Sequence, residues 1–232
     1  MKTIGLLGGM SWESTASYYA IINTAVKESL GGLHSAKICL YSVDFAEIEA
    51  LQMAGDWQQA GHLLAQAAKN IAAAGAEGLL ICTNTMHKVA NQIEAAIEIP
   101  LLHIADATAE KLLTDGVQKV GLLGTRFTME QDFYKSRLME KYGIDVLVPT
   151  EPERQSVHDI IYTELCLGKI NVSSKQRYLE VIAQLQQRGA EAVILGCTEI
   201  ALLVEQSDTS MPLYDTTRIH ALAAVEWALA NQ

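Results

Sequence analysis

The chain has 232 residues, of which 50% are hydrophobic and 19% are charged, a balance that fits a compact globular protein and excludes a disordered one. Its formal net charge of −10 disfavours nucleic acid and anionic membranes as partners, but it leaves room for a small anionic ligand. The apolar run at residues 3–8 is too short for a signal peptide or a membrane span, so we expect a soluble, cytoplasmic protein.

Strands and helices are predicted to alternate along the first half of the chain. Short apolar runs bounded by glycine or proline predict buried strands at 2–8, 36–43, 78–82 and 97–103. Helices are expected at about 12–30, at about 57–74, from about 85 onward and at about 105–114. Ser11 or Ser14 can cap the first of these helices, and Asp56 can cap the second.

The same pattern then restarts. Strands are predicted at 119–124, 144–148, 192–196 and 212–215, and helices at about 128–142, 154–167, 173–188, after 197 and at 216–230. Ser173 is the expected N-cap of the third of these helices. Strands that alternate with helices predict an α/β fold with parallel sheets.

Three matched pairs of strands indicate an internal duplication. Gly121 follows Gly5 by 116 residues, Gly189 follows Gly75 by 114, and Pro212 follows Pro100 by 112. A period this long means two lobes rather than a solenoid. We therefore predict two pseudo-symmetric lobes, each with a four-stranded parallel sheet flanked by helices, and an active site in the cleft between them.

Ligands of parallel sheets bind beyond the carboxyl ends of the strands. Polar or reactive residues follow several predicted strands at these ends: Met10, Thr83, Asn84, Thr85, Thr125, Cys197 and Thr198. Neutral donors at helix starts suit a carboxylate ligand. The glycines at 5, 8 and 9 do not have the spacing of a dinucleotide fingerprint, so a tight turn explains them better.

Cys197 is the predicted catalytic residue, because it stands between a buried strand and a helix start, where backbone N–H groups lower the pKa of a thiol. In the repeat, Thr83 occupies the equivalent position, and Cys82 lies one residue out of register with its side chain expected to point away from the cleft. Cys39 and Cys166 are expected to be packing residues. No CxxC pair exists, so neither a disulfide framework nor a metal site is predicted.

Two further side chains, His87 and Lys169, have two interpretations each. His87 either orients the residues that touch a ligand or is an ordinary hydrogen-bonded helix histidine. Lys169 is either a surface charge or a cation for an acidic side chain. Gln52 is the best neutral donor in a stretch, residues 44–68, that contains no lysine or arginine.

Together, the stretches Ile4–Thr15, Asn84–His87 and Gly196–Glu199 resemble the aspartate/glutamate racemase superfamily, in particular its racemases specific for L-aspartate and L-glutamate. The resemblance covers essentially the whole chain. It implies a racemase that needs no cofactor (no pyridoxal phosphate), and it implies two cysteines on opposite faces of the substrate Cα. It also implies that the fourth strands cross over, so that 1–99 with 210–232 form the first lobe and 100–209 the second. The family further suggests a homodimer.

The chain departs from the family pattern at one catalytic position, since Thr83 replaces the first cysteine. A threonine hydroxyl is far too weak an acid to be a ready base near neutral pH. The resemblance therefore implies that Cys197 removes the Cα proton from the L-enantiomer, with Thr83 on the opposite face. Asn84, Thr85, Thr125, Thr198 and the Met10 turn would bind the amino-acid head, and Gln52 and Lys169 the side-chain carboxylate.

Two other functions remain open at this point. A lone second-lobe cysteine also resembles the arylmalonate decarboxylases of the same superfamily, in which one thiol protonates a carbanion left by loss of CO2. A two-lobed amino-acid-binding protein that lost its activity is the third possibility.

Overall fold

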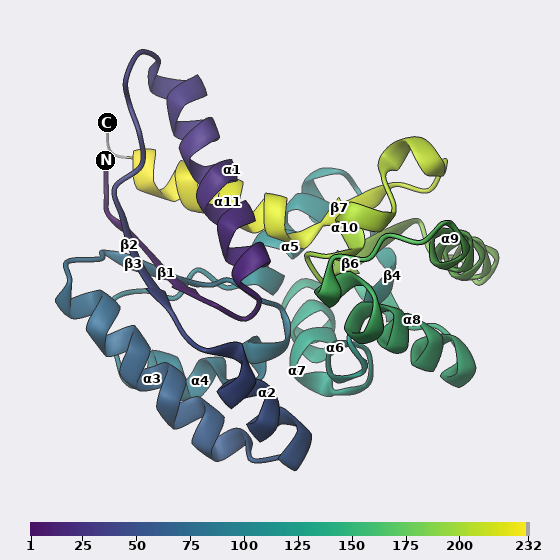
Figure 1. The fold of residues 1–232 in the computed structure, drawn as a ribbon. Coiled ribbons are helices and arrows are strands. Elements are labelled where there is room, and N and C mark those ends of the chain that lie inside the picture. Colours follow the sequence, from purple (N-terminus) through teal and green to yellow (C-terminus); the bar gives the residue numbers. More distant parts are fainter. Residues whose placement is uncertain (231–232) are drawn as a thin grey trace. The chain divides into compact units, whose positions relative to one another are not determined.

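The computed structural model describes residues 1–230. The chain folds into two compact units. The first unit comprises Met1–Ile104 and Thr217–Gln232, and the second comprises Ala105–Thr216. Each unit holds one parallel sheet with helices packed on it (Figure 1). The predicted α/β fold with two parallel sheets is confirmed.

The sheet of the first unit has the order β2-β1-β3. Its strands are β1 (Ile4–Gly8), β2 (Ile38–Ser42) and β3 (Gly78–Ile81). The predicted strand at 97–103 is reduced to a single parallel bridge between Leu101 and Leu79, so this sheet has three strands rather than the expected four. The helical elements of this unit are α1 (Trp12–Leu30), α2 (Phe45–Ala54), α3 (Trp57–Ala73), η1 (Thr85–Val89), α4 (Ala90–Glu94) and α11 (Thr216–Leu229).

Two apolar layers cover this sheet. On one face, Ile4, Leu6 and Leu80 pack with side chains of α1 and α11, which lie side by side in Figure 1. On the other face, Leu7 and Ile81 pack with side chains of α2, α3 and η1. The alternation of β1 residues between the two layers follows from the two-residue period of a strand.

The sheet of the second unit has four strands in the order β5-β4-β6-β7. They are β4 (Lys119–Gly124), β5 (Asp145–Leu147), β6 (Ala192–Gly196) and β7 (Leu213–Asp215). The helical elements are α5 (Ile104–Thr114), α6 (Arg126–Glu130), α7 (Asp132–Ser136), η2 (Arg137–Lys141), α8 (Glu151–Thr163), η3 (Leu165–Leu167), α9 (Val172–Gln187), α10 (Ile200–Leu203) and η4 (Gln206–Asp208).

The duplication is visible in how the two central strands meet their helices. A methyl group built on Gly5 would lie 2.5 Å from Ile71 of α3, and one built on Gly121 would lie 2.8 Å from Leu185 of α9. In both units, glycine at this point of the central strand lets a large helix side chain reach the sheet. Gly5 and Gly121 are the pair that the 116-residue offset aligns.

The expected crossing of the fourth strands is wrong. β7 pairs with β6 of the second sheet, and Leu101 bridges to β3 of the first, because each segment hydrogen-bonds to the strand next to it in its own repeat. The helices that follow these segments do exchange. Side chains of α11 join the apolar layer of the first unit, and nearly all of α5 belongs to the second unit.

Two smaller corrections concern helices of the second unit. The predicted continuous helix at 128–142 is three short pieces, α6, α7 and η2. The N-cap of α9 is Asn171 rather than Ser173. By contrast, Ser11 caps α1 and Asp56 caps α3 through side-chain acceptance of a backbone N–H, as predicted.

Candidate active site

Thr125 and Cys197 leave the second sheet at the same edge. The parallel pairing of β4 with β6 places Gly124 opposite Gly196, so the next residue of each strand extends past the carboxyl end of the sheet. Thr125 is buried and caps α6, with its Oγ1 accepting the Thr128 N–H at 3.4 Å. The arrangement places a hydroxyl and a thiol together where ligands of parallel sheets bind.

The Cys197 thiol is half-buried, and its Sγ donates a hydrogen bond to Glu199 Oε2 at 3.0 Å. Burial, followed by repulsion from the Glu199 carboxylate, raises the pKa of the Cys197 thiol well above its usual value. The predicted lowering of this pKa by a helix N-terminus is therefore wrong. The helix begins only at Ile200 and has four residues, whereas the carboxylate is in direct contact.

Other predicted residues of the second unit differ in their exposure. Thr198 is half-buried beside Cys197, whereas Lys169 is exposed in the connector that follows η3. The Lys169 backbone N–H donates to the Glu164 carbonyl, which fixes the main chain and leaves the long side chain to solvent. The structure therefore does not bring the Lys169 ammonium group into a buried site.

In the first unit, predicted site residues likewise follow the carboxyl ends of the strands. Leu7 of β1 lies opposite Ile81 of β3, so the Met10 turn and the Thr83–Thr85 segment emerge at the same end of the sheet. The Cys82 N–H donates to the Leu7 carbonyl at 2.9 Å. Thr83 is half-buried, whereas Met10, Asn84 and Thr85 are buried.

Gln52 carries an unsatisfied polar atom. The side chain is 4% exposed, and Nε2 contacts Met86 Sδ at 2.9 Å. Among the described residues, none donates a hydrogen bond to its Oε1. A buried amide oxygen without a partner costs roughly 1–3 kcal/mol, which a polar ligand would offset. Because Oε1 is an acceptor, it would pair with a ligand N–H or O–H group, so it does not bear on the predicted role of Gln52 as a donor to a carboxylate.

Cys82 lies in the core. It is fully buried in the layer formed with Tyr18, Ile22 and Leu80, and this burial strongly raises the pKa of its thiol. A thiol in this environment stays protonated and is inert. The prediction that its side chain points away from the strand-end site agrees with this placement.

The histidines of the first unit are more closely associated than the sequence indicates. His87 and His103 have ring centroids 4.4 Å apart, and His87 and His220 have centroids 5.9 Å apart. All three side chains are buried. Sequence reasoning gave no role to His220, because it lies on α11, far along the chain from the other two and without a motif of its own.

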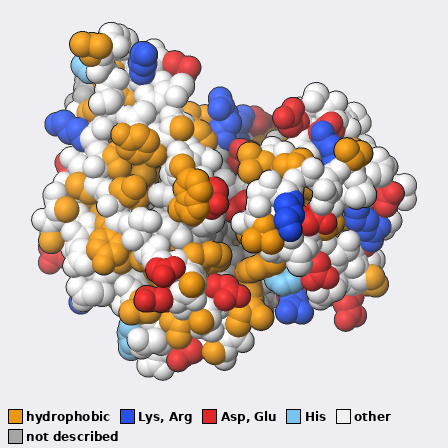
Figure 2. All heavy atoms as spheres, viewed as in Figure 1, with side chains coloured by type: hydrophobic (Ala, Val, Ile, Leu, Met, Phe, Trp, Pro, Cys, Tyr) orange, Lys and Arg blue, Asp and Glu red, His pale blue; other side chains and the backbone are white. Residues whose placement is uncertain are grey.

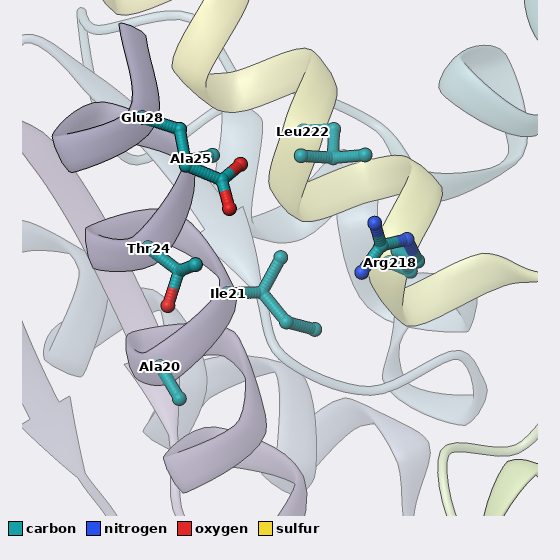
Figure 3. A pocket seen from close by; sticks show the side chains of 7 residues that line it. All are labelled: Ala20, Ile21, Thr24, Ala25, Glu28, Arg218 and Leu222. Carbon is teal, nitrogen blue, oxygen red and sulfur yellow. The ribbon is translucent and has the colours of Figure 1, made fainter. Parts of the chain in front are cut away.

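The first unit has several surface hollows, and the two described next contain none of the residues predicted to bind substrate. One lies between α1 and α11, with Thr24 and Glu28 on one wall and Arg218 and Leu222 on the other (Figure 3). The other is an apolar groove lined by Trp12, Ala16, Tyr19 and Leu40, among others. Figure 2 shows further hydrophobic side chains exposed on the surface of this unit.

No group of three or more histidine, cysteine, aspartate or glutamate side chains in residues 1–230 is arranged to hold a metal ion. Within the same residues, no helix is both long and apolar enough to cross a membrane.

Comparison with known proteins identifies relatives along the whole chain. Residues 7–224 match the Asp/Glu/Hydantoin racemase family. The crystal structure of a candidate Asp/Glu racemase from Yersinia pestis is 59% identical and covers 99% of this chain and 100% of that chain, with a TM-score of 0.93. That of an aspartate racemase homologue from Pyrococcus horikoshii OT3 is 35% identical and covers 98% and 99%, with a TM-score of 0.85. The broad specificity amino-acid racemase RacX of Bacillus subtilis (strain 168) is 22% identical over 68% of this chain and 67% of its own.

Proposed function

The chain belongs to the Asp/Glu/Hydantoin racemase family, and from this premise we propose that it is a cofactor-independent racemase acting on L-glutamate and L-aspartate. The observation that carries the proposal is the Cys197 thiol at the carboxyl end of β6, hydrogen-bonded to Glu199 at 3.0 Å. The equivalent end of β3 carries Thr83. A thiol and a hydroxyl are both groups that can transfer protons, and here they stand at corresponding strand ends of the two sheets.

In the proposed reaction, the Cys197 thiolate removes the Cα proton of the L-enantiomer and becomes a thiol, leaving a carbanion stabilised by the substrate carboxylate. A proton then reaches the opposite face of Cα through the Thr83 hydroxyl, which passes on a proton from water. Because a hydroxyl is a much weaker acid than a thiol, this second transfer is slow. We therefore expect fast Cα exchange from the L-side and slow net inversion, with an equilibrium ratio of one to one.

Two features set the protonation state of the resting site. Burial of Cys197, and after it repulsion from the Glu199 carboxylate, raise the thiol pKa and favour the neutral thiol. An α-ammonium group bound beside this pair would offset the negative charge of Glu199 and make the thiolate more accessible. In this proposal the free enzyme keeps its thiol protonated, and the thiol releases its proton to solvent when bound substrate favours the thiolate, which then takes the Cα proton.

Neutral donors and one cation bind the substrate in this proposal. Asn84, Thr85, Thr125, Thr198 and the backbone N–H groups of the Met10 turn hold the carboxylate and ammonium groups. Gln52 reaches the side-chain carboxylate through the second N–H of its Nε2, since the first contacts Met86. Lys169, whose side chain is exposed, would have to swing inward to add its positive charge.

The test is incorporation of deuterium at Cα of L-glutamate and L-aspartate in D2O, followed by proton NMR. We expect exchange with the wild type and a loss of at least about 100-fold in Cys197→Ala, since general-base catalysis contributes about 10²–10⁴-fold. Cys39→Ala, at a half-buried cysteine of β2, is the matched control and should retain exchange. Undiminished exchange in Cys197→Ala would overturn the assignment.

Two other experimental results would each support a different function. Release of CO2 from a disubstituted malonate, without Cα exchange of amino acids, would identify a decarboxylase. Thermal stabilisation by L-glutamate with no exchange at all would identify a binding protein that has lost its activity.

A further inference from the structure

The three buried histidines of the first unit form a cluster of contacting rings that the proposed chemistry does not use. His87 lies between His103 and His220 in ring contact, and all three are at most 5% exposed. His87 sits on η1, directly after the Thr83–Asn84 segment. The cluster therefore adjoins the strand end at which the proposal places the weaker acid.

The hydrogen bonds of His87 determine which of its nitrogens carries the proton. The Ile104 backbone N–H donates to His87 Nε2 at 3.3 Å, so Nε2 must present a lone pair. Nδ1 lies 2.8 Å from the Thr83 carbonyl oxygen, which can only accept, so Nδ1 carries the hydrogen. Both contacts are satisfied by one species only, the neutral imidazole protonated at Nδ1.

His220 is fixed by the same logic. Its Nε2 lies 2.7 Å from the Leu102 carbonyl oxygen and therefore donates to it, and its Nδ1 lies 2.8 Å from the Tyr18 hydroxyl and accepts from it. Burial lowers the pKa of His220 to about 4, consistent with a neutral ring. Because the nitrogens of both His87 and His220 are engaged, these rings hold backbone in place and are not arranged as metal ligands.

The cluster also lies where the chain leaves and re-enters the first unit. Ile104, which donates to His87, is the last residue before the chain enters the second unit, and Thr217, three residues before His220, is the first after it returns. His87 thus ties the Thr83 carbonyl to the outgoing segment, and His220 ties the returning helix to Leu102. Hydrogen bonds of His87 thus link Thr83 to the outgoing segment, and the ring contact with His220 links His87 to the returning helix.

We propose that His87 is a positioning residue for Thr83: its neutral Nδ1–H anchors the Thr83 carbonyl and thereby orients the hydroxyl on the same residue. This inference rests on the proposed function for its catalytic consequence. The anchoring itself concerns only contacts within the first unit.

Two variants separate the two hydrogen bonds of His87. In His87→Asn, the side-chain N–H₂ takes the place of Nδ1 and can still donate to Thr83, whereas Ile104 loses its acceptor. In His87→Gln, the amide oxygen takes the place of Nε2 and can accept from Ile104, whereas Thr83 loses its donor. His62→Gln, at an exposed histidine of α3, is the control.

Cα exchange and D-to-L turnover would be measured for all variants. We expect His87→Gln to lower kcat for D-to-L turnover by about 10–100-fold with KM changed less than about threefold, because small displacements of a reacting group cost rate. His87→Asn should restore at least about tenfold of that loss. If kcat fell equally in both variants, or fell in proportion to the loss of thermal stability, His87 would only support packing. Either result would overturn the proposal.

Two NMR readouts do not depend on activity. Long-range ¹H–¹⁵N spectra of the wild type should show His87 protonated at Nδ1, and the Thr83 carbonyl ¹³C shift should move in His87→Gln but stay close to wild type in His87→Asn. An Nε2-protonated ring or an unmoved Thr83 shift would refute the anchoring. A wild type that anchors Thr83 in this way but exchanges no Cα proton would instead refute the proposed function.

Discussion

Replacing Glu199 with glutamine tests whether this carboxylate suppresses the reactivity of Cys197. The carboxylate accepts the thiol hydrogen bond at 3.0 Å, and its charge is one of the causes that raise the thiol pKa. Glutamine keeps the size and an acceptor oxygen but removes the negative charge. The thiolate should therefore form more readily in the variant, because a like charge no longer faces it.

The distance between Cys197 Sγ and Glu199 Oε2 gives the size of the charge repulsion that the variant removes. Two unit negative charges 3.0 Å apart repel by about 5 kcal/mol at an effective dielectric constant of about 20. Solvent at this half-buried site and small side-chain movements remove much of this energy. If only about 1.4 kcal/mol survives, the thiolate fraction below the thiol pKa rises tenfold. We expect a rise of about tenfold or more.

The assay is the rate of iodoacetamide alkylation at pH 8, followed by mass spectrometry of the peptide that contains Cys197. Peptide mapping separates this thiol from Cys39, Cys82 and Cys166. Glu140→Gln, at an exposed glutamate of the same unit, is the matched control and should not change the rate. Alkylation of Cys197 that is unchanged or slower in Glu199→Gln would refute the electrostatic reasoning.

Three further predictions follow from the first unit. Because burial lowers the pKa of His220 to about 4, against about 6.5 in the unfolded chain, the unfolded state binds more protons between these values. The free energy of unfolding by urea should thus fall by up to about 3 kcal/mol from pH 6.5 to pH 4, and His220→Asn should flatten this fall; an equal fall in the variant would contradict it. Cys82→Ser places a hydroxyl in an apolar core and should cost about 1–3 kcal/mol of stability while Cα exchange persists; lost exchange in a folded variant would contradict the inert role. Thr83→Cys should raise D-to-L turnover at least about tenfold, since a thiol is the stronger acid, and an unchanged rate would contradict the position given to Thr83.

The sequence was sufficient to predict the internal duplication and every strand except the one expected at 97–103, because strand ends and glycine positions repeat at nearly constant offsets. Gly5 and Gly121 occupy the same place in the two units, each facing a large side chain of the covering helix. The error in strand crossing has a simple cause. Resemblance to a family indicates which segments form the fold. It does not determine which strands pair, and the pairing of β7 with β6 depends on contacts between segments far apart in the sequence.

The candidate site was predictable in its residues and less so in its electrostatics. Cys197 at a strand end follows from the glycine-bounded apolar run that precedes it. The direction of its pKa shift does not, because that shift depends first on burial of the thiol and then on where the Glu199 carboxylate lies. The histidine cluster depends on α11 packing beside α1, so residues near 87, 103 and 220 meet only in three dimensions.

Solvent-deuterium exchange at Cα of L-glutamate and L-aspartate tests the central claim most directly. The proposed function predicts that wild-type protein, without added cofactor, replaces the Cα proton of the L-enantiomer with deuterium, and that Cys197→Ala loses at least about 100-fold of this rate. It also predicts that D-enantiomer accumulates more slowly than deuterium enters. Absence of exchange in the folded wild type, or exchange that persists without the Cys197 thiol, would contradict it.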